Sequence, residues 1–202
     1  MKGYELVGKV WSVESFRRYF SDVNTSWANS VTMHHTYSPS LEQRPEGFLA
    51  QHMINLRYFY RVKLGWSRGP HLFVDDRGDI EGMSSLYLPG THARSFNKKS
   101  IGIEVLGNYD DEDPLTGRGL ACWTTAAKLV GVILNKKGLS PSGTSIKFHR
   151  DDPKTSKTCP GTKVTKAWFV EMVIKEMEDE KNDANLTNTQ RITIIEDHLK
   201  LS

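Results

Sequence analysis

The chain is poor in cysteine, in long apolar runs and in dense blocks of one charge, and each shortage argues against a class of protein. Only two of its 202 residues are cysteines, too few for the disulfide framework of a small secreted domain. No stretch approaches the roughly 18 consecutive apolar residues of a membrane-spanning helix, so we expect no membrane insertion. The net charge is only +3, without five adjacent Lys or Arg residues, and we expect no nucleic-acid partner.

The first residues also lack the apolar core of a secretory signal. We therefore expect no signal peptide and a chain that stays, at least at first, in the cytoplasm, where a disulfide between the two cysteines is disfavoured. With 38% hydrophobic and 25% charged residues, the composition is typical of one soluble globular domain, which we expect to be monomeric. Cys122 and Cys159 are left for packing, metal binding or catalysis.

Apolar periodicity and turn residues predict helices and strands that alternate along the chain. Helices are expected at 10–22, 46–65, 122–138 and 165–181; strands are expected at 30–36 and 100–107, in a hairpin over 70–83, and at 145–149. This order predicts an α/β fold with a mixed central β-sheet flanked by helices. We expect a single domain over residues 1–181, with the N-terminal helix as an addition, followed by a linker and C-terminal tail at 182–202 in which 191–202 can form a short helix.

Three potential metal ligands stand at or just after predicted strand ends, namely His34, His149 and Cys159. Two imidazoles and a thiolate, with a fourth position open to water, are a known ligand set for catalytic zinc, whereas structural zinc usually needs four ligands in C-x-x-C pairs. Each histidine alone has the ordinary alternative of a hydrogen-bonded residue. In "SIGIEVLG", strand alternation also places Glu104 on a face where a neighbour would normally be apolar.

Four segments in the same chain order resemble one family. They are "VTMHHTYSPS", "GWSRGPHLFVDDRGDIEG", "GTHARSFNKKSIGIEVLGN" and "FHRDDPKTSKTCPG". These segments are similar to the signature segments of the zinc-dependent N-acetylmuramoyl-L-alanine amidases, which include phage endolysins, peptidoglycan-recognition proteins and cytosolic cell-wall-recycling amidases. The resemblance covers residues 30 to 175 and implies the mixed-sheet fold of that family.

The resemblance implies one Zn²⁺ ion per chain, held by His34, His149 and Cys159. It also places Lys157, two residues before the last ligand, as the cation that stabilises the tetrahedral oxyanion. Many family members carry a tyrosine just before the hairpin histidine, but this chain has Pro70 there, and proline has no proton to exchange. The recycling amidases use the glutamate of "SIGIE" instead, which makes Glu104 the expected general base; its alternative is a glutamate paired with a surface cation.

Four further residues are expected to contact substrate. His35 follows the first ligand at a position that varies in the family, and we expect it in the cleft wall. His92 and Asn97 resemble positions that line the substrate groove. His71 is expected to face the cleft, with a hydrogen-bonded core histidine as an equal alternative.

The resemblance implies zinc-dependent hydrolysis of the amide between N-acetylmuramic acid and L-alanine in peptidoglycan, with host-cell lysis by a phage endolysin as the favoured setting. A cytosolic muropeptide-recycling amidase is the alternative among enzymes. A peptidoglycan-binding protein without activity is a third outcome, disfavoured because the three ligands and both auxiliary residues, Glu104 and Lys157, are present.

Overall fold

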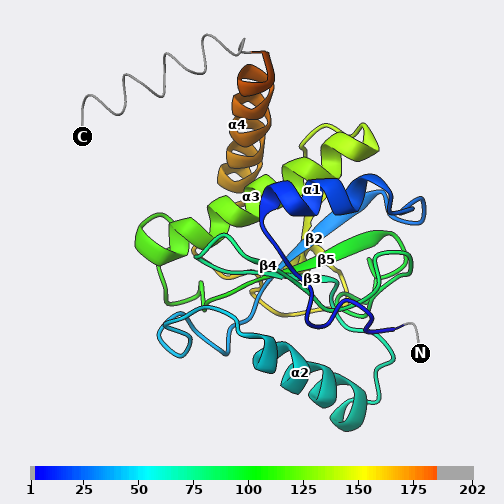
Figure 1. Ribbon diagram of the computed structural model, residues 1–202. Helices are drawn as coiled ribbons and strands as arrows, with labels where there is room; N and C mark the ends of the chain where they lie inside the picture. Colours follow the sequence, from blue (N-terminus) through cyan, green and yellow to red (C-terminus); the bar gives the residue numbers. More distant parts are fainter. Residues whose placement is uncertain (1–2, 186–202) are drawn as a thin grey trace.

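The computed structural model describes residues 3–185 and contains one mixed β-sheet with helices on both sides (Figure 1). The strands are ordered β1-β4-β3-β5-β2-β6. Strands β3, β5, β2 and β6 run parallel, whereas β4 is antiparallel to both of its neighbours, β1 and β3. Their bounds are β1 Val10–Trp11, β2 Ser30–His35, β3 Leu72–Val74, β4 Ile80–Gly82, β5 Ser100–Val105 and β6 Ile146–Phe148. The predicted fold class is therefore confirmed.

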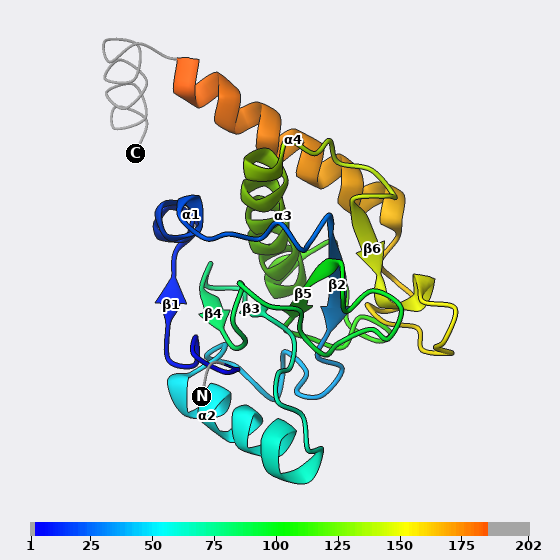
Figure 2. The ribbon, with the colours of Figure 1, turned by 90° about the vertical axis from the view of Figure 1, so that its right-hand side faces the viewer.

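The helices lie unevenly on the two faces of this sheet. In Figures 1 and 2, α1 and α3 lie on one side and α2 lies on the other, while α4 packs across α3. Their bounds are α1 Val13–Ser21, α2 Ala50–Tyr58, α3 Gly117–Lys137 and α4 Lys166–Asn185; the π-helical turn η1, Phe59–Lys63, continues α2, and the 3₁₀ turn η2 covers His149–Asp151. Within residues 3–185 no helix is long and apolar enough to cross a membrane.

Several predicted boundaries were wrong. The first helix starts at Val13, where Ser12 caps it by accepting a hydrogen bond from the Ser15 amide; residues 10–11 instead form an edge strand. The second helix starts at residue 50, after Leu49 in an extended conformation. Gly47 has a left-handed φ of 67°, which a helix does not contain, and a Cβ there would lie 2.2 Å from an Asp75 carboxylate oxygen. Residues 182–185 belong to the last helix rather than to a linker, and the expected helix at 191–202 lies outside the described residues.

The strand register aligns polar side chains along one face of the sheet. His34 on β2 pairs with Glu104 on β5, which pairs with Phe73 on β3, which pairs with Glu81 on β4. Paired residues point to the same face. Because β2, β5 and β6 are parallel, their carboxyl ends meet at one edge, the usual location of a ligand site in such sheets.

Candidate metal centre and active site

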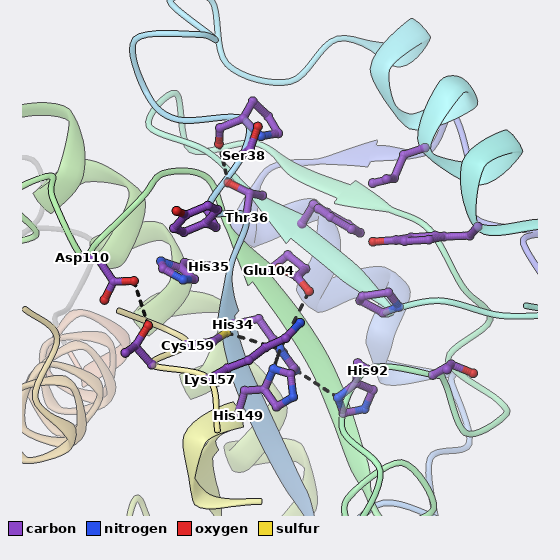
Figure 3. A pocket seen from close by; sticks show the side chains of 18 of the residues that line it. His34, His35, Thr36, Ser38, His92, Glu104, Asp110, His149, Lys157 and Cys159 are labelled. Carbon is purple, nitrogen blue, oxygen red and sulfur yellow. Dashed lines mark hydrogen bonds and ion pairs between the residues drawn. The ribbon is translucent and has the colours of Figure 1, made fainter. Parts of the chain in front are cut away.

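The three predicted metal ligands converge at this edge. His34 is the penultimate residue of β2, His149 follows β6, and Cys159 lies in the loop that returns toward the sheet. The Nδ1 atoms of the two histidines are 3.1 Å apart, and the Cys159 Sγ is 3.7 Å from the His34 Nδ1. One potential ligand atom from each residue lies within 4.8 Å of the others. Figure 3 shows the three side chains pointing toward one another.

These separations fit a tetrahedral zinc ion. Zinc–nitrogen bonds of about 2.0–2.1 Å and a zinc–sulfur bond of about 2.3 Å at tetrahedral angles separate two nitrogens by about 3.3 Å, and a nitrogen from a sulfur by about 3.6 Å. Burial lowers the pKa of His34 well below 6.5 and also lowers that of His149, so both imidazoles are neutral at neutral pH, the form that binds a metal. The donor set and its spacing therefore suit zinc.

The hydrogen bonds of His92 determine which ring nitrogen of His34 is free to bind a metal. The His92 Nε2 is 3.1 Å from the Ser100 carbonyl oxygen, which can only accept, so Nε2 carries the proton. Since burial lowers the pKa of His92 to about 3, its ring is neutral, and its Nδ1 accepts a hydrogen bond from the His34 Nε2, 3.1 Å away. The His34 Nδ1 then has its lone pair free for a metal.

A glycine makes room for this arrangement. A Cβ on Gly102 would lie 2.6 Å from the His92 ring, so a side chain at this position of β5 would displace the imidazole.

Asn97 was expected to line the substrate groove, but it is not among the residues around the cavity. Its amide oxygen instead accepts hydrogen bonds from the backbone N–H groups of His92 and Ala93, both at 2.8 Å. Asn97 therefore shapes the loop that holds His92.

Glu104 and Lys157 stand beside the ligands. The Glu104 Oε1 is 3.9 Å from the His34 Nδ1, and its side chain is 13% exposed. Burial raises the pKa of Glu104 to about 8, opposed by the positive charge of Lys157. That charge also helps to lower the pKa of His149. In Figure 3 the Lys157 side chain extends toward the space between Glu104 and the two histidines. A carboxyl group and an ammonium group thus face the same metal position.

The remaining two predicted contacts have different surroundings. His35 lines the cavity, and its Nδ1 accepts a hydrogen bond from the Tyr109 amide at 3.1 Å. His71 is completely buried and does not line the cavity: its Nδ1 accepts from the Gly102 amide at 2.9 Å, and its Nε2 is 3.1 Å from the Leu88 carbonyl oxygen. These bonds make His71 a hydrogen-bonded core histidine, which is the second of the two alternatives that the sequence left open, and not a residue of the cleft.

A cavity of about 620 Å³ opens over the metal position. Its lining contains the three ligands, Glu104 and Lys157. It also contains a mostly apolar set of residues, Phe48, Leu56, Tyr60, Trp66, Pro70 and Phe73. Such a lining offers both polar and apolar contacts to a ligand.

The sequence analysis missed two carboxylates that fix the loops around the cavity. Asp110 accepts hydrogen bonds from the Thr158 hydroxyl and the Thr162 amide, both at 2.7 Å, and so holds the loop that carries Cys159. Asp152 accepts from the hydroxyl and the amide of Ser95, at 2.6 and 2.9 Å, and ties the His149 loop to the His92 loop. Each joins segments distant in sequence, and no local pattern marks such a contact.

The fold and the site together define a peptidoglycan amidase or recognition domain. The family model of the N-acetylmuramoyl-L-alanine amidases (Amidase_2) matches residues 24–162. The chain belongs to this family, whose members cut or bind peptidoglycan.

Individual relatives agree with this family. Peptidoglycan-recognition protein SC2 of Drosophila melanogaster is 31% identical over 111 residues, which are 54% of this chain and 56% of that protein. The chain thus spans about half the length of that relative.

Two solved structures share the fold. The N-acetylmuramoyl-L-alanine amidase LysC from Clostridium intestinale is 23% identical with a TM-score of 0.52, covering 76% of this chain and 93% of that one. A Drosophila PGRP-LB mutant in complex with tracheal cytotoxin is 20% identical with a TM-score of 0.54, covering 73% and 88%. At these identities the likeness shows the fold.

Proposed function

We propose that this protein is a zinc-dependent N-acetylmuramoyl-L-alanine amidase that hydrolyses the amide between N-acetylmuramic acid and L-alanine in peptidoglycan. The observation that carries the proposal is the convergence of His34, His149 and Cys159 at tetrahedral spacing in a cavity that also contains Glu104 and Lys157. A protein that only binds peptidoglycan has no need of a carboxyl group and an ammonium group beside the ligands. Their presence therefore favours catalysis.

The residues divide the work of amide hydrolysis between them. When bound, a zinc ion at the three ligands supplies a Lewis acid at this end of the cavity. Glu104, in its ionised form, accepts a proton from the attacking water as the water oxygen bonds to the scissile carbonyl carbon. Lys157 places a positive charge near the carbonyl oxygen as that oxygen becomes negative. The C–N bond then breaks, and the L-alanine nitrogen leaves with the proton that Glu104 returns.

We further propose that the intact wall is the substrate, as for a phage endolysin that acts at host-cell lysis. A muropeptide-recycling amidase has the same chemistry but acts on soluble fragments. The two settings therefore differ in the size of the preferred substrate. A binding protein without activity would release nothing from either substrate.

Digestion of purified sacculi and of soluble muropeptides, followed by mass spectrometry, tests the proposal. We expect free stem peptides with new L-alanine amino termini, uncut glycan strands, and faster release from sacculi. Faster release from soluble muropeptides would replace the endolysin setting with recycling. New reducing sugar ends as the main product would show a glycosidase, and no product from zinc-loaded protein would show a binding protein.

A further inference from the structure

Tyr60 adds a hydrogen-bond donor to the wall of the cavity. It lies in the π-helical turn η1, where the Leu64 amide donates to the Phe59 carbonyl oxygen at 3.2 Å. Within residues 3–185 its hydroxyl has no hydrogen-bond partner, although the residue lines the cavity. Phe48, Leu56 and Phe73, which line the same cavity, have no hydrogen-bond acceptor in their side chains. A phenol without a partner in an apolar wall is suited to a ligand oxygen.

The ring of Tyr60 is held in place by its surroundings. It stacks on Trp66 with a centroid distance of 5.4 Å and an interplanar angle of 24°, and the Trp66 amide donates to the Tyr60 carbonyl oxygen at 2.9 Å. Two of its ring carbons lie 2.7 Å from the point where a Cβ on Gly69 would be. A glycine at 69 is therefore needed for the ring to lie this close to the segment that leads into β3.

Tyr60 and Glu104 line the same cavity, and Tyr60 is close enough to Glu104 to be affected by its charge. Burial raises the pKa of Tyr60 well above 10, and the negative charge of Glu104 raises it further. The hydroxyl consequently keeps its proton at neutral pH and can act only through hydrogen bonds. The adjoining Pro70 also lines the cavity and has no donor to offer.

We propose that Tyr60 is a catalytic residue of this amidase, whose hydroxyl donates a hydrogen bond to the scissile carbonyl oxygen, so that Tyr60 and Lys157 approach that oxygen from different elements. This inference rests on the proposed amide hydrolysis. The oxygen gains negative charge as the tetrahedral intermediate forms, so a donor fixed before the reaction stabilises the transition state more than the bound substrate.

The test compares zinc-loaded wild type, Tyr60→Phe and Tyr58→Phe on a soluble muropeptide. Tyr58 lies two residues earlier, is 58% exposed and does not line the cavity, so its substitution is the matched control. We expect Tyr60→Phe to lower kcat about 100-fold, as loss of one oxyanion donor does, with KM changed by less than about twofold. Zinc content and melting temperature should equal those of the wild type, and Tyr58→Phe should match the wild type throughout.

Three results would overturn the assignment while leaving the amidase proposal intact: unchanged kcat in Tyr60→Phe, a defect confined to KM, or a loss of kcat that follows lowered zinc content or melting temperature. A zinc-loaded wild type that releases no L-alanine amino termini would overturn the proposed function, and the role of Tyr60 with it.

Discussion

Two glutamates lie on the same face of the sheet, two strands apart, and only one of them opens onto the cavity. Glu104 on β5 and Glu81 on β4 are both register partners of Phe73 on β3. Burial is the main cause of a raised pKa at both, to about 8 for Glu104 and about 7 for Glu81. Each also follows an isoleucine in a short strand, so local sequence and burial describe them alike.

Their neighbours differ. Glu104 faces His34 at 3.9 Å and experiences the positive charge of Lys157. Glu81 is 2% exposed, the negative charges of Asp79 and Asp75 raise its pKa further, and its Oε2 has no hydrogen-bond partner within residues 3–185. Burial and a raised pKa therefore do not identify a general base. Access to the cavity and to the metal ligands does.

Replacing each glutamate by glutamine should give the largest difference in kcat between the Glu104 and Glu81 variants. We expect Glu104→Gln to lower kcat by about two to four orders of magnitude, the range for a positioned acid–base group. The amide keeps the size of the side chain but cannot accept the proton. Amide cleavage should be followed at saturating muropeptide, with zinc content measured on the same samples.

Glu81→Gln is the matched control, and its kcat should stay within about twofold of the wild type because Glu81 does not line the cavity. Near-normal turnover in zinc-loaded Glu104→Gln would make that glutamate structural. The base would then have to be sought elsewhere, first at His35, which also lines the cavity.

The sequence predicted those parts of the site that depend on short segments. His34, His149 and Cys159 are found together because strand ends and a return loop follow from local patterns, and strand alternation singled out Glu104. The contacts of His92 could not be predicted in this way. Its role depends on the space above Gly102, and that space exists only once β5 has formed.

The same distinction explains the errors in the fold. Strand β1 has two residues, too few for any periodicity, and it exists through pairing with β4 about seventy residues later. The sequence left His71 open between the cleft and the core, because it shows which residues are near in the chain and not which carbonyl oxygens a ring will contact. Cys122 and Cys159 are both buried free thiols in the structure.

Glu104 lies beside the metal ligand His34, whereas Glu81 does not. The next prediction tests whether His92 orients His34. We expect His92→Phe to weaken zinc binding about 10- to 100-fold, the usual effect of removing a partner behind a metal ligand. His92→Gln retains an acceptor for the His34 Nε2 proton and should recover most of the affinity. Competition with a chromogenic chelator measures zinc affinity without reference to activity. Equal affinities in all three proteins would show that His92 does not orient His34.

The smallest expected effect concerns stability at Glu81. In the folded protein the Glu81 carboxyl group keeps its proton up to about pH 7, whereas in the unfolded chain it releases that proton near pH 4.3. The folded state therefore binds more protons between these values, and the stability that comes from neutral Glu81 is present below about pH 4 and lost as the pH rises through 7. The stability of Glu81→Gln relative to wild type should thus rise by about 2 to 3 kcal/mol between pH 5 and pH 8.

Urea unfolding of both proteins across this range gives the difference directly, because the contributions of all other groups cancel. A constant difference between pH 5 and pH 8 would show that Glu81 titrates normally in the folded protein. The contrast with Glu104 would then lie in burial as well as in access to the cavity.

The central claim is that His34, His149 and Cys159 hold one zinc ion on which amide hydrolysis depends. The most direct test strips the protein with a chelator, removes the chelator and restores zinc stepwise while cleavage of muropeptide is measured. Cys159→Ser should show reduced zinc occupancy, and Cys122→Ser, altered in helix α3 away from the cavity, should behave like the wild type. We predict that activity disappears on stripping and rises with added zinc until about one ion per chain is bound. Full activity in the thoroughly stripped protein would contradict the account.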